Sequence, residues 1–119
     1  MDKTLSPELR AEELLSELSI EEKVAQLNCY FPQKADFDGI RKASKHGIGQ
    51  ISSLEMRSME SLEEAVNFQL KAQRIIMEQS KHRIPAIFHM EGLCGAYIQD
   101  ATSFPTGIGR ASSWDSELE

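Results

Sequence analysis

Hydrophobic residues recur at helical spacing near the start of the chain. Ser6-Pro7 places a cap residue before a proline at the first helical position, and this predicts a helix. Its apolar stripe consists of Leu14, Leu15 and Leu18. Ser19-Ile20-Glu21-Glu22 has the pattern of a capping box and predicts a second short helix that ends near Leu27.

The next segment is irregular. Asn28 to Asp36 predicts a loop interrupted by Pro32, because proline breaks regular hydrogen bonding. A third short helix is expected over Phe37 to Lys45, ending at Gly47.

The middle of the chain predicts a strand, a long helix and a second strand. Gly47 to Ile51 favours a short strand. Ser61 to Glu64 is another capping box, and the helix that it opens should reach about Gln79. The apolar arc of this helix is too wide for one neighbour, so it should pack on a sheet and on flanking helices. Ile84 to Met90 is apolar without alternation, which predicts a strand buried on both faces of a parallel sheet.

This order predicts an α/β protein with one βαβ unit. Two parallel strands do not make a stable sheet, and only a weak strand could come from Gly92 to Glu119. In addition, Ser113 to Glu119 resembles the first turn of a new helix. We therefore expect a segment of a larger domain, and a complete small α+β domain is the alternative.

Composition and charge exclude several classes of protein. The chain has 119 residues, 40% hydrophobic, with 19 acidic and 13 basic side chains and a net charge of -6. An acidic balance argues against nucleic acid as a partner, and no apolar run approaches the roughly 20 residues that span a bilayer. The residues after Met1 include no apolar leader, which favours a cytoplasmic protein if this is the native start.

The two cysteines, Cys29 and Cys94, lie far apart and have no metal-ligand spacing. They could form one disulfide, but two reduced and mostly buried thiols are the favoured interpretation. The chain also has no phosphate loop, dinucleotide fingerprint or metal-ligand cluster, so we expect no cofactor and no metal.

Candidate chemistry lies just past the carboxyl ends of the expected strands, where parallel α/β folds bind ligands. Glu55, Met56 and Arg57 follow the first strand. His89, Glu91, Gly92, Cys94 and Gly95 follow the second. A carboxylate at Glu91 can accept bonds from two hydroxyls, which suits a polyol or a sugar. It could equally cap the following turn or pair with Arg57.

The remaining candidates have plainer interpretations. A lone histidine such as His89 is more often a structural residue than a general base. Arg57 could pair with an acidic group but is more often a solvated loop charge. His46 and His82 are expected at the surface, and Trp114 in the core.

Six segments of the chain resemble glycoside hydrolase family 3. They occur in the family's order and spacing, over roughly residues 9 to 119: Leu18–Leu27 (LSIEEKVAQL), Gly47–Gly49 (GIG), Arg83–Phe88 (RIPAIF), His89–Gly95 (HMEGLCG), Ala101–Pro105 (ATSFP) and Ala111–Asp115 (ASSWD). The first is similar to the family pattern L-T-x-E-E-K-x-x-Q-L, and the fourth to x-[DE]-x-x-H-G. Glu117-Leu118 also follows as the family pattern expects.

The resemblance implies the N-terminal portion of a (β/α)₈ TIM-like barrel, incomplete in this chain. Residues 1–46 would be a helical lead-in and residues 47–119 the first βα units. Members of the family are exo-acting retaining glycosidases such as β-glucosidases and β-xylosidases, with two catalytic carboxylates. Both would lie beyond residue 119, so no catalytic residue is expected here, and the partners would be a glycoside substrate and the rest of the barrel. The alternative function is a non-catalytic sugar- or partner-binding module.

One functional position of the family falls in this chain, at Glu91. The resemblance implies that it binds hydroxyls of the terminal, non-reducing sugar. Two departures from the family matter: Cys94 stands where histidine is common, and Glu91 stands where aspartate is common. The longer side chain would reach toward the place of a hexose C6 group, which leads us to expect a preference for pentosides such as xylosides.

Overall fold

The computed structural model describes residues 4–117, and the chain is a mixed helix and strand protein. In chain order the elements are α1 (Pro7–Glu17), α2 (Ile20–Gln26), β1 (Cys29–Tyr30), α3 (Phe37–Ala43), β2 (Gln50–Ser52), the 3₁₀ helix η1 (Leu54–Ser58), α4 (Leu62–Gln79), β3 (Ile87–His89) and α5 (Gly107–Ala111). The expected helices from Ser6, Ser19, Phe37 and Ser61 are therefore confirmed. The expectations for the residues after Met1 and for Leu118 fall on residues 1–3 and 118–119, which lie outside the described residues.

The strands form a three-stranded sheet in the order β1-β2-β3, and both pairs are parallel. The expected parallel βαβ unit is confirmed, because α4 connects β2 to its parallel neighbour β3. The prediction of a loop over Asn28 to Asp36 is wrong at Cys29–Tyr30, which form β1. A strand of two residues before Pro32 is too short to produce a periodic signal.

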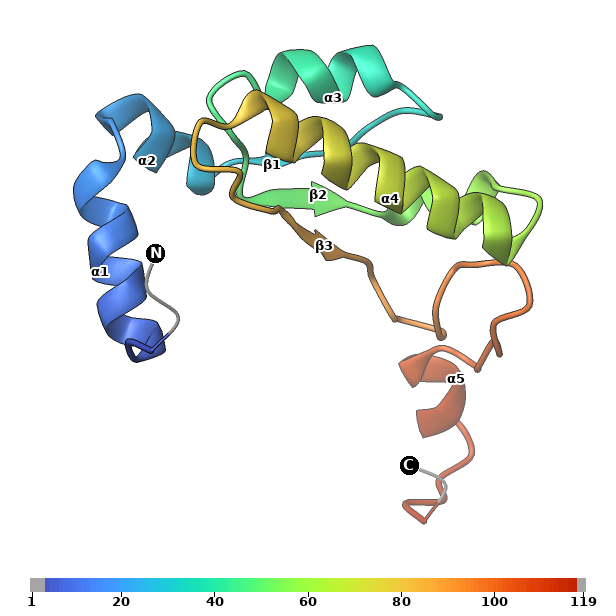
Figure 1. Cartoon of the computed structure of the whole chain (residues 1–119). Coiled ribbons are helices and arrows are strands. Elements are labelled where there is room, and N and C mark those ends of the chain that lie inside the picture. Colours follow the sequence, from blue (N-terminus) through green and yellow to red (C-terminus); the bar gives the residue numbers. More distant parts are fainter. Residues whose placement is uncertain (1–3, 118–119) are drawn as a thin grey trace.

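Helices α3 and α4 cover one face of the sheet (Figure 1). Tyr30, Ile51 and Phe88 occupy equivalent positions on the three strands and contact the hydrophobic core on this side. Helix α4 contributes buried Ala65, Phe68, Ala72, Ile75 and Ile76. Packing of α4 on both the sheet and a helix is thus confirmed, although Leu62, Val66 and Leu70 of its wide apolar arc are exposed.

Within residues 4–117 no element covers the opposite face of the sheet (Figure 1), and we call it the open face. It presents Cys29, Gln50, Ser52, Ile87 and His89, of which all but the half-buried Ser52 are exposed. Ile87 is 68% exposed, so the prediction that this strand is buried on both faces is wrong for the described structure. The apolar sequence of the strand indicates that its second face packs against other residues, and residues 4–117 do not cover that face.

Two contacts attach the strands to their neighbours. At Gly49 an added Cβ would overlap the Gln26 carbonyl oxygen, so only glycine permits the end of α2 to approach so closely. β2 begins at Gln50 rather than at the predicted Gly47, and the Gly49 N–H before it donates to the Ala25 carbonyl of α2 at 3.2 Å. The side-chain amide of Gln73 in α4 donates to the Ala86 carbonyl and accepts from the Ala86 N–H, both at 3.1 Å, just before β3.

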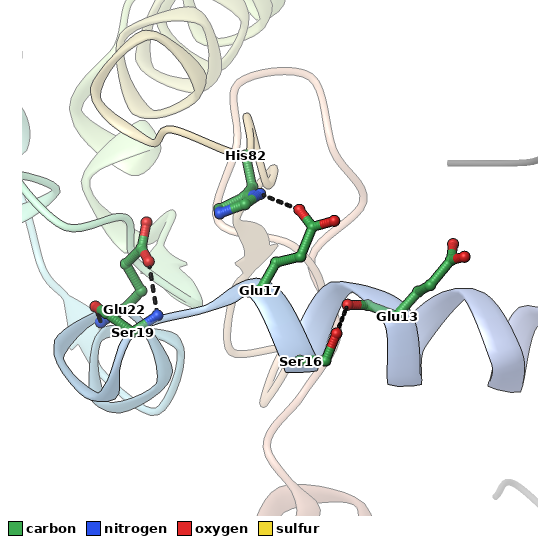
Figure 2. A network of polar contacts seen from close by, with 6 residues as sticks. All are labelled: Glu13, Ser16, Glu17, Ser19, Glu22 and His82. Carbon is green, nitrogen blue, oxygen red and sulfur yellow. Dashed lines mark hydrogen bonds and ion pairs between the residues drawn. The ribbon is translucent and has the colours of Figure 1, made fainter.

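An ion pair between Glu17 and His82 attaches α1 to the loop after α4, and Figure 2 also shows the capping box at the start of α2. Ser19 and Glu22 form the predicted capping box, with bonds of 2.9 and 3.2 Å, and the Ser19 N–H lowers the pKa of Glu22. His82 Nδ1 lies 3.5 Å from Glu17 Oε2 and its side chain is only 10% exposed. The prediction that His82 lies at the surface is therefore wrong, whereas His46 is exposed as expected.

The C-terminal part differs most from expectation. Where only a weak strand was considered, Thr106 caps the short helix α5 through the Gly109 N–H. Trp114 is 95% exposed, so its assignment to the core is wrong within the described structure. The Ser113 hydroxyl, just before Trp114, accepts from the Asp115 N–H at 3.2 Å, and the expected helix opening extends past Glu117 to positions outside the described residues.

Candidate functional site

The carboxyl ends of β2 and β3 lie together. Ser52 pairs with His89 at the end of the two strands, and the Ser53 N–H donates to the His89 carbonyl at 2.7 Å. Arg57 follows β2 in η1, and Glu91 follows β3 by two residues. The parallel pairing therefore brings both predicted residues to one edge of the sheet, which we call the rim.

The loop after Glu91 has a fixed backbone. The Phe104 N–H donates to the Cys94 carbonyl at 2.8 Å and closes the loop. Gly95 has a φ of +93°, and a Cβ added there would overlap the Thr102 carbonyl oxygen. The expected sharp turn thus requires glycine at Gly95, whereas an added Cβ at Gly92 meets nothing within 4 Å.

Tyr97 connects the groups at the rim. A side-chain hydrogen bond with Cys94 is the main cause that raises the pKa of Tyr97. The charge of Glu91 also raises the pKa of Tyr97, and the charge of Arg57 opposes this effect. The charges of Glu91 and Arg57 therefore both act on the phenol of Tyr97.

Neither structural alternative for Glu91 is seen in the described part of the chain. Glu91 is exposed, forms no ion pair with Arg57 and accepts no hydrogen bond from the turn that follows it. Arg57 is also exposed. The acceptor oxygens of Glu91 and the donor groups of Arg57 are thus available to a ligand.

His89 lies on the open face rather than in the core. It is exposed, and its Nε2 lies 3.3 Å from the Cys29 Sγ of β1. Both cysteines are free thiols, Cys29 exposed and Cys94 partly exposed. The expected burial is therefore wrong for Cys29, whereas Cys94 is partly buried.

Glu55, the other acidic candidate, has a structural environment. It is buried, with 9% of its surface exposed, and its Oε1 accepts from the Ser58 hydroxyl at 3.0 Å within η1. Sequence reasoning did not select Tyr97, and nothing in its spacing could have selected it, since the contact with Cys94 depends on how the loop closes. Among residues 4–117 no group of three or more His, Cys, Asp or Glu could hold a metal ion.

The rim therefore combines a carboxylate, a guanidinium and a phenol, and the imidazole of His89 lies below them. Such a set can exchange hydrogen bonds with several hydroxyls of one small ligand. No protein-family model matches the chain, and comparison with curated proteins gives no significant match. No helix of the described chain is long and apolar enough to cross a bilayer.

Proposed function

We propose that this chain is the N-terminal part of the (β/α)₈ barrel of an exo-acting retaining β-glycosidase resembling glycoside hydrolase family 3. In this proposal Glu91 binds hydroxyls of the terminal, non-reducing sugar, and Arg57 lines the same pocket. The two catalytic carboxylates would be contributed by later strands, so the segment alone is inactive.

One observation in particular supports the proposal. The parallel sheet is covered by helices on one face only, and Glu91 stands at the carboxyl end of its strands. This arrangement supports the proposal because the first units of a TIM barrel would have helices on the outer face, an interior face free of helices and ligands at the carboxyl ends of the strands. Segments that resemble the family include Arg83–Phe88, which leads into β3, and His89–Gly95, which forms the rim.

The first experiment is to read the gene beyond the codon for residue 119. We expect an open frame that continues through further βα units and includes an aspartate nucleophile. The encoded protein, called the complete protein below, should then hydrolyse aryl β-xyloside or aryl β-glucoside with retention of configuration. A stop codon at this point would instead favour the non-catalytic module.

The role of Glu91 is tested by Glu91→Gln in the complete protein. Loss of a hydrogen bond between a charged group and a hydroxyl costs about 1.5–3 kcal/mol, so kcat/KM should fall roughly 10- to 150-fold. Glu78→Gln changes the charge equally at an exposed position in the last turn of α4 and should leave kcat/KM unchanged. Equal kinetics of the two variants would remove Glu91 from the sugar site.

The comparison of the two substrates tests the expected pentoside preference. Because the side chain of Glu91 is one methylene longer than aspartate, we expect the xyloside to be turned over better. Much better turnover of the glucoside would contradict this expectation, and Glu91→Asp should shift the ratio toward the glucoside.

A further inference from the structure

The open face has a polar region directly below the rim. Exposure alternates from Ile87 to Glu91: Phe88 and Met90 pack against the core, whereas Ile87, His89 and Glu91 are exposed. Alternate residues of an extended chain share a face. Glu91 therefore lies on the same face of the chain as His89.

The strand register adds a residue of β2 to this face. Residues that lie opposite one another on neighbouring strands form a row. Ser52 lies opposite His89, and Gln50 lies opposite Ile87 in the next row away from the rim. Neighbouring strands are about 4.8 Å apart, and rows on one face are about 6.6 Å apart along a strand. Ser52, His89 and Glu91 thus enclose an area that one sugar ring can cover.

Cys29 determines how the His89 ring lies. The thiol belongs to β1, on the far side of β2, so the 3.3 Å contact with Nε2 holds the imidazole across the open face. The other ring nitrogen, Nδ1, is a donor in one tautomer and an acceptor in the other, and either can bind a sugar hydroxyl. The Ser52 hydroxyl supplies both a donor and an acceptor.

We propose that Ser52 and His89 form the floor of the pocket whose rim is Glu91, and that they bind hydroxyls of the same sugar. Cys29 is then a positioning residue that acts through His89. This inference rests on the proposed function, and it adds residues from β2 and from the strand interior to the site. Ile87 lies beside them and offers an apolar surface to the C–H groups of the ring.

The test uses His89→Ala and Ser52→Ala in the complete protein, with Gln50→Ala as the matched control from the next row. Loss of a neutral hydrogen bond is worth about 0.5–1.5 kcal/mol, so each floor variant should lower kcat/KM roughly 2- to 13-fold, and the control should not. Cys29→Ala should give a smaller loss than His89→Ala, and the double variant should match His89→Ala.

Monodeoxy xylosides distinguish binding from a structural effect. On the substrate that lacks the hydroxyl bound by His89, His89→Ala should cause no further loss, because the two changes remove the same bond. Equal losses on every deoxy substrate, accompanied by a lower Tm, would show a structural role and overturn the inference.

The two proposals fail in different ways. If Glu91→Gln is impaired but His89→Ala and Ser52→Ala behave like Gln50→Ala, the inference about the floor is overturned and the proposed function stands. If the complete protein neither hydrolyses nor binds any β-glycoside, the proposed function is overturned and the floor is overturned with it.

Discussion

The serines before the helices show how single residues determine where an element begins. Ser6, Ser19 and Ser61 each accept a hydrogen bond from an N–H in the first turn of the helix that follows. At Ser61 only half of the predicted capping box forms, because Glu64 accepts from the Glu60 N–H instead. Such signals are local, so the sequence could reveal them.

Ser19→Ala should weaken α2 specifically. Loss of the cap costs about 1 kcal/mol, so amide exchange in α2 should accelerate about fivefold. Ser16→Ala is the matched control, because Ser16 only donates to the Glu13 carbonyl inside α1, and alanine favours a helix (Figure 2). Equal acceleration by both variants, measured by hydrogen exchange and mass spectrometry, would contradict the role of the cap.

Gly95→Ala should disrupt the loop that follows Glu91. The positive φ and the contact with the Thr102 carbonyl both exclude a Cβ, so we expect a loss of more than about 1 kcal/mol. Gly92→Ala, with open space around it, should be nearly neutral. The measurement is amide exchange at Phe104, whose N–H closes the loop, and unchanged exchange in Gly95→Ala would refute this role of Gly95.

The location of a candidate site residue was predictable where it followed from the position of that residue after a strand. Glu91 and Arg57 follow strands of a parallel sheet, and such positions lie at the same edge of the sheet because the strands are parallel. Tyr97 could not be found, because its approach to Cys94 depends on the path of the loop. His82 and Trp114 were assigned wrongly for the same kind of reason, since contacts distant in sequence determine their burial.

Among the elements, long helices were predictable and short strands were not. The 18 residues of α4 contain five turns of apolar periodicity and a cap. In contrast, β1 has only two residues, and its pairing with β2 is the only reason that it is a strand. Exposed and half-buried residues alternate along β3, yet the exposed Ile87 and the half-buried Phe88 are both apolar, so periodicity could not indicate which face is open.

Ile76→Ala should test the packing of α4 on the sheet. Ile76 is fully buried in the core, and truncation of such a side chain costs about 2–5 kcal/mol. Leu70→Ala lies on the same helix at 62% exposure and should cost much less. We expect amide protection throughout α4 to fall sharply in the first variant only, and similar protection in both would contradict the described core.

The whole molecule is extended. Its radius of gyration is 18.2 Å, whereas a compact domain of 119 residues has about 14 Å. Helices α1 and α5 project from different ends of the sheet unit (Figure 1), and neither contains a buried residue. The sequence could indicate that more cover is needed, because the apolar surface of α4 and β3 exceeds what their neighbours in the chain can bury.

The 119-residue chain expressed alone should unfold with weak cooperativity or aggregate. Its open sheet face and the exposed side of α4 leave apolar groups in water, so a hydrophobic dye should also bind. The measurement is calorimetry together with circular dichroism, with the complete protein as the control. A sharp two-state transition would favour the alternative of a complete small α+β domain.

The bond pair between Gln73 and Ala86 has a consequence for the order of assembly. The side-chain amide presents one donor and one acceptor to the backbone, as a neighbouring strand would, only 13 residues away along the chain. Closing so short a loop costs little entropy. Helix α4 can therefore hold the start of β3 before β3 pairs with β2. The pairing of β2 with β3, the two paired strands that lie farthest apart along the chain, then begins from a segment already in place.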